Sequence, residues 1–242
     1  MIAIRTNNLC KEYDNKIAVS SLNLELEEGK LIALLGVNGA GKTTTIKMLS
    51  CLTQPTSGDA TIFNHSIIND SYAIKELINV SPQETAIAPN LTVYENLEFI
   101  CGVYGYDKEE AKRKSLEMIN DFDLLSIEKQ KASTLSGGWQ RRLSIAMALI
   151  TNPKVLFLDE PTLGLDVLAR RELWNFIESL KGKMTIILTT HYLEEAEALS
   201  DKIVIMSKGH LIAQGSAQEL IQQTHSQTFE DAFVSLCGGQ LS

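Results

Sequence analysis

LIALLGVNGAGKT, residues 31–43, places a short apolar run directly before a glycine-rich turn. The run is typical of a strand buried on both faces, and after the turn Ile46, Leu49 and Leu52 recur at a helical spacing. The turn matches G-x-x-x-x-G-K-[ST], whose glycines let backbone N–H groups surround phosphate oxygens at a helix N-terminus. We therefore predict a nucleotide phosphate site formed by Gly36, Val37, Asn38, Gly39, Ala40, Gly41, Lys42, Thr43 and Thr44.

Two side chains of this turn and two later acids have expected chemical roles. Lys42 would reach the β- and γ-phosphates, and the Thr43 hydroxyl would ligate Mg²⁺. The run VLFLDE, residues 155–160, would carry Asp159 to the carboxyl end of a strand, where open α/β sheets bind ligands. We expect Asp159 to hold Mg²⁺, and Glu160 to accept a proton from the attacking water.

Further runs indicate how strands and helices alternate along the chain. TIILTT, residues 185–190, and IVIM, residues 203–206, are predicted as buried strands. Residues 168–180 between them and the earlier strand are predicted to be helical, because their apolar side chains recur on one face. That face is formed by Ala169, Leu173, Phe176, Ile177 and Leu180. The alternation favours an α/β fold with a mainly parallel sheet.

Residues 86–152 interrupt this alternation. The segment is long and helical in pattern, without a convincing buried strand, so we interpret it as an inserted helical subdomain. At its entrance Thr92 and Glu95 form a Thr-x-x-Glu capping box, which predicts a helix that starts near Val93.

Composition excludes several classes of protein. With 242 residues, 44% of them hydrophobic, the chain can bury a sizeable core, and its net charge of −8 disfavours nucleic acid as a partner. The four cysteines are far apart, which argues against a zinc site or a disulfide framework. No leader or apolar run near the ~18 residues of a membrane span is visible, so we expect a cytosolic chain whose membrane role would need a partner.

Six motifs together resemble an ATP-binding cassette (ABC) ATPase, in order and approximate spacing. They are GVNGAGKT, Gln83 in SPQE, LSGG at 135–138, VLFLDEPT, GLD and His191 in TTHYLEEA. The resemblance covers nearly the whole chain and implies a P-loop NTPase fold within one nucleotide-binding domain, residues 1–242. The implied parts are a RecA-like core with an antiparallel β-subdomain (1–85 and 153–224), the helical subdomain (86–152) and a C-terminal tail (225–242).

The resemblance also implies roles for single residues of the chain's own ATP site. Tyr13 resembles the aromatic that stacks on adenine. Gln83 matches the glutamine that touches Mg²⁺ and the attacking water and that hinges the helical subdomain. His191 matches the histidine that contacts the γ-phosphate, so Glu160, His191 and Gln83 form the expected catalytic group.

Two cassettes of this family pair head to tail, and this pairing implies roles across the dimer. Ser136, Gly137 and Gly138 would present a helix N-terminus to the γ-phosphate held by the other subunit. Asp166 resembles the aspartate that links the two active sites, and it could equally be the N-cap of the helix that follows. The family usually has Gln at position 139, where this chain has Trp139 followed by Gln140, and the effect of this departure is left open.

Nearby charged residues are expected to be structural. Glu194, Glu195 and Glu197 suit the first turn of a helix after His191 because of its dipole. The pairs Arg141–Arg142 and Arg170–Arg171 are expected to make solvated or interdomain contacts.

The implied function is an ATPase that uses ATP and Mg²⁺, dimerises on Mg-ATP and drives a separate membrane permease. The chain resembles subunits of drug, lipid or polysaccharide exporters, and it would bind the inner face of the cell membrane through the permease, pairing with itself or a sibling cassette. The alternative is a soluble ABC ATPase of an assembly complex of the iron–sulfur scaffold type, without a membrane partner. Nucleic acid is not expected as a partner.

Overall fold

The computed structural model describes residues 1–14 and 16–238. Its centre is a six-stranded sheet in the order β11-β10-β4-β9-β8-β7. The strands are β4 (Leu31–Leu35), β7 (Ile78–Ser81), β8 (Val155–Asp159), β9 (Thr185–Thr190), β10 (Lys202–Ser207) and β11 (His210–Gly215). All neighbours are parallel except β11, which runs antiparallel to β10. The predicted mainly parallel α/β sheet is therefore confirmed.

The expected buried strands lie where the sequence placed them. β4, β8 and β9 have the predicted bounds, and every residue in them is buried. Side chains alternate between two cores: Leu31 and Leu35 belong to one apolar cluster, whereas Ile32 and Leu34 belong to a second. Continuous apolar runs form strands here because both faces of the sheet are covered.

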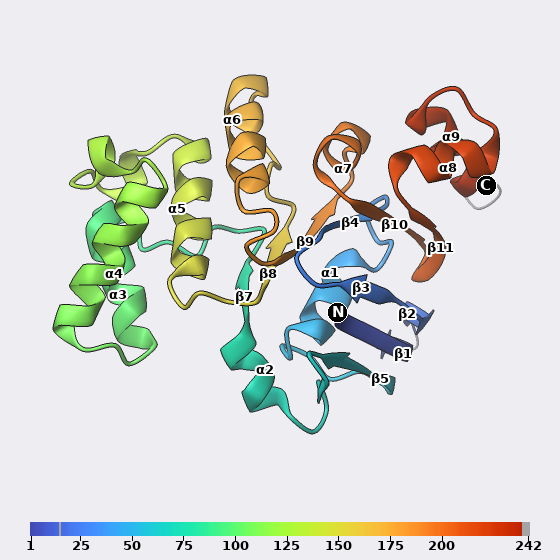
Figure 1. The fold of residues 1–242 in the computed structure, drawn as a ribbon, viewed down its shortest axis with the longest axis horizontal. Coiled ribbons are helices and arrows are strands. Elements are labelled where there is room, and N and C mark those ends of the chain that lie inside the picture. The colour runs from blue at the N-terminus through green and yellow to red at the C-terminus, as the bar shows by residue number, and fades with distance from the viewer. Residues whose placement is uncertain (15, 239–242) are drawn as a thin grey trace.

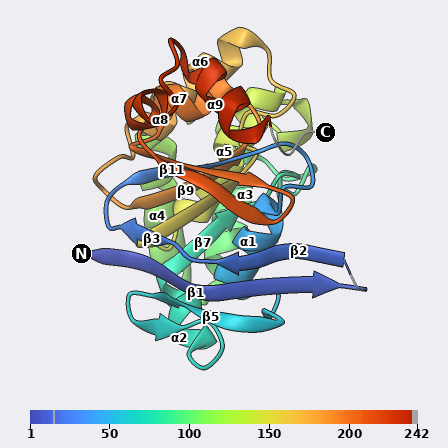
Figure 2. The same cartoon turned by 90° about the vertical axis from the view of Figure 1, so that its right-hand side faces the viewer.

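A second, antiparallel sheet is formed by the N-terminal part of the chain. It comprises β1 (Ile2–Tyr13), β2 (Lys16–Leu22), β3 (Glu25–Glu27), β5 (Ser57–Ile62) and β6 (His65–Ser66). The order is β2-β1-β5-β6, and β3 also pairs with β1. In Figure 2 the strands β1, β2 and β5 run below the central sheet, on the side opposite α6 to α9.

The helices lie around these sheets (Figure 1). They are α1 (Lys42–Leu49), α2 (Ser71–Leu77), α3 (Val93–Val103), α4 (Lys108–Asp121), α5 (Gly137–Leu149), α6 (Val167–Glu178), α7 (Leu193–Leu199), α8 (Ala217–Thr224) and α9 (Phe229–Cys237). Two short 3₁₀ helices, Leu125–Ile127 and Ala132–Thr134, lie between α4 and α5. α3, α4 and α5 stand on one side of the central sheet, and α8 and α9 on the other.

The predicted helix after the phosphate turn is shorter than its apolar spacing suggested. α1 ends at Leu49, and Cys51 has a left-handed backbone, with φ of 56°. Leu52 therefore lies beyond the helix, with 67% of its surface exposed. The helix predicted over 168–180 is α6, in which Leu173 and Ile177 are buried as expected.

The described residues 86–152 contain helices and no named strand. The predicted capping box is present at the entrance: Glu95 N donates to Thr92 Oγ1 at 3.1 Å, and Thr92 N donates to Glu95 Oε2 at 2.7 Å. α3 begins at Val93 as a result. Leu97 of α3, Leu143 of α5 and Leu158 of β8 belong to one apolar cluster, so the helical segment and the sheet share a core.

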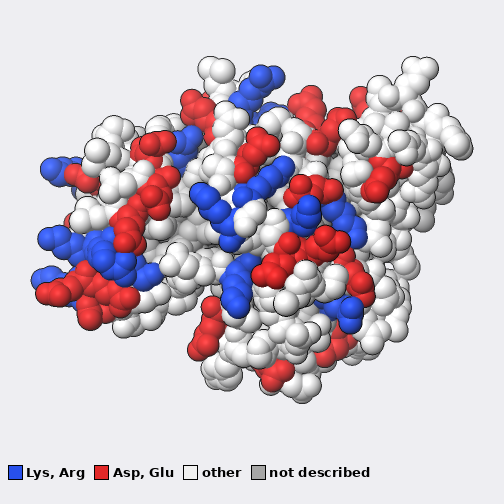
Figure 3. Space-filling model, viewed as in Figure 1, with Lys and Arg blue, Asp and Glu red and all other residues white. Residues whose placement is uncertain are grey.

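Charged side chains of both signs cover the face seen in Figure 3. Basic and acidic groups lie side by side over α3 and α4 and below the central sheet. The net charge of −8 is thus not gathered into one acidic field on this face.

Candidate active site

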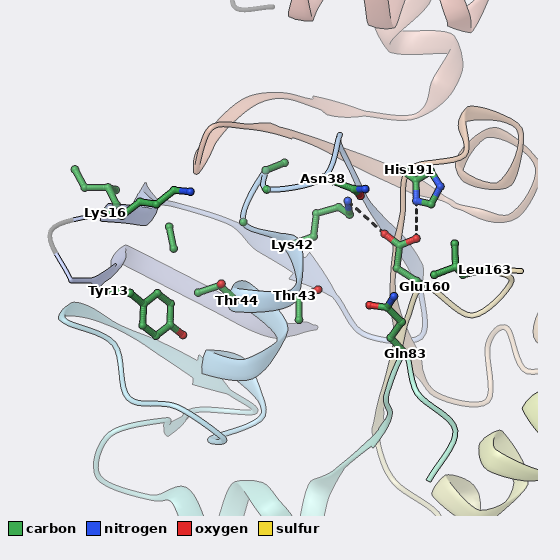
Figure 4. A pocket seen from close by; sticks show the side chains of 15 residues that line it. Tyr13, Lys16, Asn38, Lys42, Thr43, Thr44, Gln83, Glu160, Leu163 and His191 are labelled. Carbon is green, nitrogen blue, oxygen red and sulfur yellow. Dashed lines mark hydrogen bonds and ion pairs between the residues drawn. The ribbon is translucent and has the colours of Figure 1, made fainter. Parts of the chain in front are cut away.

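Most of the predicted nucleotide-site residues line one cavity of about 540 Å³ (Figure 4). Residues far apart in sequence meet there because β4, β8 and β9 are neighbours and end at the same edge of the sheet. The predicted residues that line the cavity are Tyr13, Asn38, Gly39, Ala40, Gly41, Lys42, Thr43, Thr44, Gln83, Glu160 and His191. Lys16, Ile17, Ala18 and Leu163 also line it, and the sequence analysis had not named them.

The glycine-rich turn connects β4 to α1, and close backbone approaches explain two of its glycines. A Cβ on Gly36 would lie 2.3 Å from the carbonyl oxygen of Met206. Gly41 precedes α1 with φ of 101°, and a Cβ there would lie 2.5 Å from the Ala18 oxygen. Only glycine fits both positions without shifting a neighbouring strand.

Lys42 is held at the centre of the turn. Its Nζ donates to Gly36 O at 2.6 Å and to Val37 O at 3.4 Å. The same ammonium lies 3.4 Å from Glu160 Oε1. Both side chains are buried, so this cation and this carboxylate compensate each other in a region of weak solvent screening. Figure 4 shows the two side chains facing each other at one end of the cavity.

Glu160 directly follows β8 and bonds to the end of β9. Its φ is 49°, a left-handed conformation that costs a non-glycine residue about 1 kcal/mol or more. Its N–H donates to Thr189 O at 3.2 Å and to Thr189 Oγ1 at 3.0 Å, which hold this conformation in place. The carboxylate is thereby placed 2.6 Å from His191 Nδ1, measured from Oε2.

Asp159 and Thr43 bring two oxygen ligands together. Thr43 Oγ1 donates to Asp159 Oδ1 at 3.1 Å, and Thr189 Oγ1 donates to the same oxygen at 2.5 Å. In Figure 4 the Gln83 amide lies beside Glu160 at the same end of the cavity. Hydroxyl, carboxylate and amide oxygens are ligands that Mg²⁺ accepts, so this donor set fits the predicted ion.

Tyr13 lies at the other end of the cavity, at the end of β1 and away from Glu160. Tyr13 is 43% exposed, and Lys11 Nζ lies 4.9 Å from the centroid of its ring. An exposed ring at the cavity mouth is available for stacking on a flat ligand.

Ser136, Gly137 and Gly138 lie outside this cavity. Ser136 is the N-cap residue of α5 by its backbone, yet among the described residues its side chain makes no capping bond to that helix. Gly138 packs against α6 so closely that a Cβ there would lie 3.1 Å from Ala169 Cβ. The turn that begins α5 is thus not part of its own chain's cavity.

Trp139 and Gln140, where the chain departs from the resembled motif, make different contacts. Gln140 Nε2 donates to Ala132 O at 3.0 Å and to Leu135 O at 3.3 Å, which fastens the start of α5 to the preceding 3₁₀ helix. The Arg142 guanidinium lies 4.7 Å from the Trp139 ring. These side chains pack within the chain.

Asp166 has the capping role that its position allowed. Its Oδ1 accepts hydrogen bonds from Leu168 N and Ala169 N, both at 2.9 Å, at the start of α6. Its role across a dimer stays a prediction.

Two charged residues that were expected to have structural roles are buried. Arg141, expected at a solvated or interdomain contact, is 4% exposed and donates to backbone oxygens of Pro82, Gln83 and Asp159. Burial lowers the pKa of Arg141 to about 10, although Asp159 and Glu195 act in the opposite direction. The available signal was the apolar character of α5 on all sides, since Leu143 to Leu149 are all buried.

Glu195, expected as a structural acid in the first turn of a helix, lies in the first turn of α7 and is buried. It is 0% exposed, and Trp174 Nε1 donates to its Oε1 at 3.1 Å. Burial raises the pKa of Glu195, while the polar groups of Thr190, Thr162 and Trp174 lower it in part.

No helix in the part of the chain that the structure describes is long and apolar enough to cross a bilayer.

Comparison with known proteins identifies one family. The ABC transporter family profile matches residues 19–163. The chain is 38% identical over 219 residues to the daunorubicin/doxorubicin resistance ATP-binding protein DrrA of Streptomyces peucetius, which covers 90% of this chain and 66% of that protein. It is 42% identical over 209 residues to the human phospholipid-transporting ATPase ABCA3, and this alignment covers 86% of this chain and 12% of that protein. The chain therefore spans just under two thirds of the first relative and a small part of the second.

Solved structures agree with the sequence comparison. An ATP-binding subunit of an ABC transporter superposes with a TM-score of 0.83 at 26% identity, covering 98% of this chain and 99% of that one. A dimeric ATP-binding cassette in a post-hydrolysis state, bound to ADP and Pi, superposes with a TM-score of 0.77 at 26% identity, over 88% of this chain and 98% of that one. The fold class expected from the motifs is thus confirmed.

Proposed function

Because this chain belongs to the ABC transporter family, we propose that it is the ATP-hydrolysing subunit that drives a separate membrane permease. The observation that carries the proposal is the grouping of Lys42, Glu160 and His191 at one end of a cavity that Tyr13 borders at the other. A cavity with a flat apolar surface at one end and phosphate-binding groups at the other suits a nucleotide.

Each polar side chain of the cavity has a proposed task. Lys42 and the backbone N–H groups of the turn would hold the β- and γ-phosphates. Thr43, Asp159 and Gln83 would hold Mg²⁺, which offsets phosphate charge when bound. Glu160 would take a proton from the attacking water, and His191, whose Nδ1 lies 2.6 Å from the Glu160 carboxylate, would contact the γ-phosphate.

We propose that the site is completed by a second cassette, either another copy or a sibling. Ser136, Gly137 and Gly138 would then contact nucleotide on the partner, and Asp166 would lie between the two sites. The placement of the α5 turn outside its own cavity supports this role, as does the Ser136 side chain, which makes no cap bond within the described residues. An anionic γ-phosphate at that helix N-terminus would be favoured by the dipole.

The proposed direction of transport is export, and the proposed location is the inner face of the cell membrane, through the permease. The relatives named for drug resistance and phospholipid transport support this direction. A soluble assembly ATPase is not favoured, since these relatives carry no such name. The division of the chain into a core with a β-subdomain (1–85 and 153–224), a helical subdomain (86–152) and a tail (225–242) is part of the same proposal.

The test uses Glu160→Gln, which removes the proposed base and keeps the side-chain size. With Mg-ATP this variant is expected to bind nucleotide, to hydrolyse it at least about 100-fold more slowly than the wild type, and to accumulate as a dimer by light scattering. A variant that stays monomeric with bound ATP would contradict the shared site.

The permease is tested with the same variant, tagged and recovered from gently solubilised native cells in Mg-ATP. A multi-span membrane protein is the expected companion. A soluble scaffold, with none of the variant on membranes, would contradict the transporter function and leave only the ATPase.

A further inference from the structure

Arg141 of α5 forms hydrogen bonds with two other segments, residues 82–83 and the end of β8. The proposed ATPase cycle needs these three segments at fixed relative positions. Resting on the proposed function, we propose that Arg141 is a positioning residue that ties the α5 turn (135–138) to the backbone of Gln83 and Asp159. Its Nη1 donates to Pro82 O and, at 3.3 Å, to Gln83 O. Its Nη2 donates to Asp159 O at 2.6 Å.

Because of its position on α5, Arg141 couples the N-terminus of this helix to the backbone oxygens that accept its hydrogen bonds. The helix begins at Gly137, so Arg141 lies about one turn, or roughly 6 Å, below the N-terminus. A helix turn transmits displacement because its backbone hydrogen bonds are stiff. When the α5 turn shifts relative to the cavity, the guanidinium must move with it or lose its acceptors.

The acceptors are backbone oxygens next to functional side chains. Asp159 ends β8, and its side chain bonds to Thr43, whereas its carbonyl bonds to Arg141. Gln83 lines the cavity with its amide while its carbonyl accepts from the same guanidinium. Arg141 thus fixes the main chain that carries both proposed Mg²⁺ ligands without touching the ion site itself.

A guanidinium is suited to this task, and an ammonium is not. Its planar fork presents several N–H donors in fixed directions, so one group can bind segments that approach from different sides. Removing it from water is costly, and its pKa of about 10 records that cost. Buried groups of opposite charge, Asp159 and Glu195, favour the charged form. Burying this cation costs folding free energy, so stabilisation of the fold does not explain its presence. A positioning role is therefore favoured.

Lys114 offers a matched control for a general loss of stability. It is another buried cation of the helical segment, and its Nζ donates to Ile150 O at 3.0 Å and lies 4.6 Å from the Tyr106 ring. Its contacts do not include Gln83 or Asp159. Lys114→Met therefore removes a buried cation and its hydrogen bond, while the hydrogen bonds of Arg141 remain.

The experiment compares full-length wild type, Arg141→Met, Arg141→Lys and Lys114→Met. Nucleotide affinity is measured without turnover by equilibrium binding of ATP in the absence of Mg²⁺, and kcat and KM are measured for Mg-ATP. We expect Arg141→Met to lower kcat by about 10- to 100-fold through misplacement of the reacting groups, with nearly unchanged ATP affinity. Arg141→Lys should stay well below wild type, because a single ammonium cannot replace the fork.

Amide hydrogen exchange supplies the readout that a merely stabilising residue would not move. In Arg141→Lys, exchange is expected to quicken at the amides of residues 83 and 84 and in the first turn of α5, whereas Lys114→Met should leave those amides as in wild type. Wild-type kcat in either Arg141 variant would overturn the inference, and so would unfolding of both variants while Lys114→Met folds. A wild type that neither binds nor hydrolyses ATP would instead refute the proposed function.

Discussion

At the scale of single residues, burial sets the chemistry of acids that look alike in sequence. Glu160 and Glu195 are both buried, but Glu160 has Lys42 at 3.4 Å and His191 at 2.6 Å. Glu195 has the indole N–H of Trp174 on Oε1, and Oε2 has no hydrogen-bond partner within the described part of the chain. The first carboxylate is paired and faces the cavity, whereas burial raises the pKa of the second.

Glu195→Gln is expected to remove a pH-dependent loss of stability. With a folded-state pKa raised from the ordinary value of 4.5, the folded protein binds more protons than the unfolded chain above that value, so wild-type stability falls as pH rises from about 5 toward 7. The isosteric amide keeps the Trp174 bond and does not titrate. Urea unfolding from pH 5 to 7 should show the variant gaining relative to wild type; a constant difference would contradict the burial effect.

At the scale of elements, the start of α3 shows local sequence acting alone. Thr92 and Glu95 satisfy each other's backbone N–H groups, and the helix begins at the next residue, Val93. The capping box needs no residue that is distant in the sequence, which is why the Thr-x-x-Glu pattern predicted it. At the end of α1 the local pattern failed. The apolar spacing predicted a helix as far as Leu52, but the helix ends at Leu49 and Leu52 is exposed.

Thr92→Ala is expected to lower the free energy of unfolding by about 1 kcal/mol, because it leaves a backbone N–H of α3 without its acceptor. Thr92→Ser, which keeps the hydroxyl, is the control and should lose much less. The measurement is the urea midpoint at constant m-value. Equal losses in both variants would mean that the Thr92 methyl group, and not the cap, stabilises this helix start.

At the scale of the whole molecule, the α5 turn and the cavity belong to different surfaces of one chain. Lys42 and Thr43 line the cavity, whereas Ser136 and Gly138 line a small hollow beside Trp139 on α5 and Ala169 on α6. In the proposed dimer, the α5 turn of one cassette and the cavity of the other would meet at one nucleotide. The proposed dimer is therefore a property of the arrangement of elements and not of either motif alone.

Ser136→Arg is expected to abolish ATP-dependent dimerisation while the monomer binds ATP almost as well as wild type, because the bulky cation would occupy the proposed contact with the partner. Gln223→Arg adds the same charge to the exposed face of α8 and serves as the control. Light scattering of both in a Glu160→Gln background, with equilibrium ATP binding, makes the comparison. Equal loss of ATP binding and dimerisation would place the turn in its own subunit's site.

Sequence by itself determined the phosphate turn, the buried strands and the α3 cap, because each depends on residues within a few positions of one another and on apolar runs that need two covered faces. The positions of Lys42, Glu160 and His191 also followed, since the carboxyl ends of parallel strands meet at one edge. Only the tertiary structure decided that Arg141 and Glu195 are buried. Arg141 bonds to Gln83 and Asp159, and Glu195 bonds to Trp174. These partners lie 18 to 58 positions away in the sequence, so the burial of both residues depends on packing that no local pattern specifies.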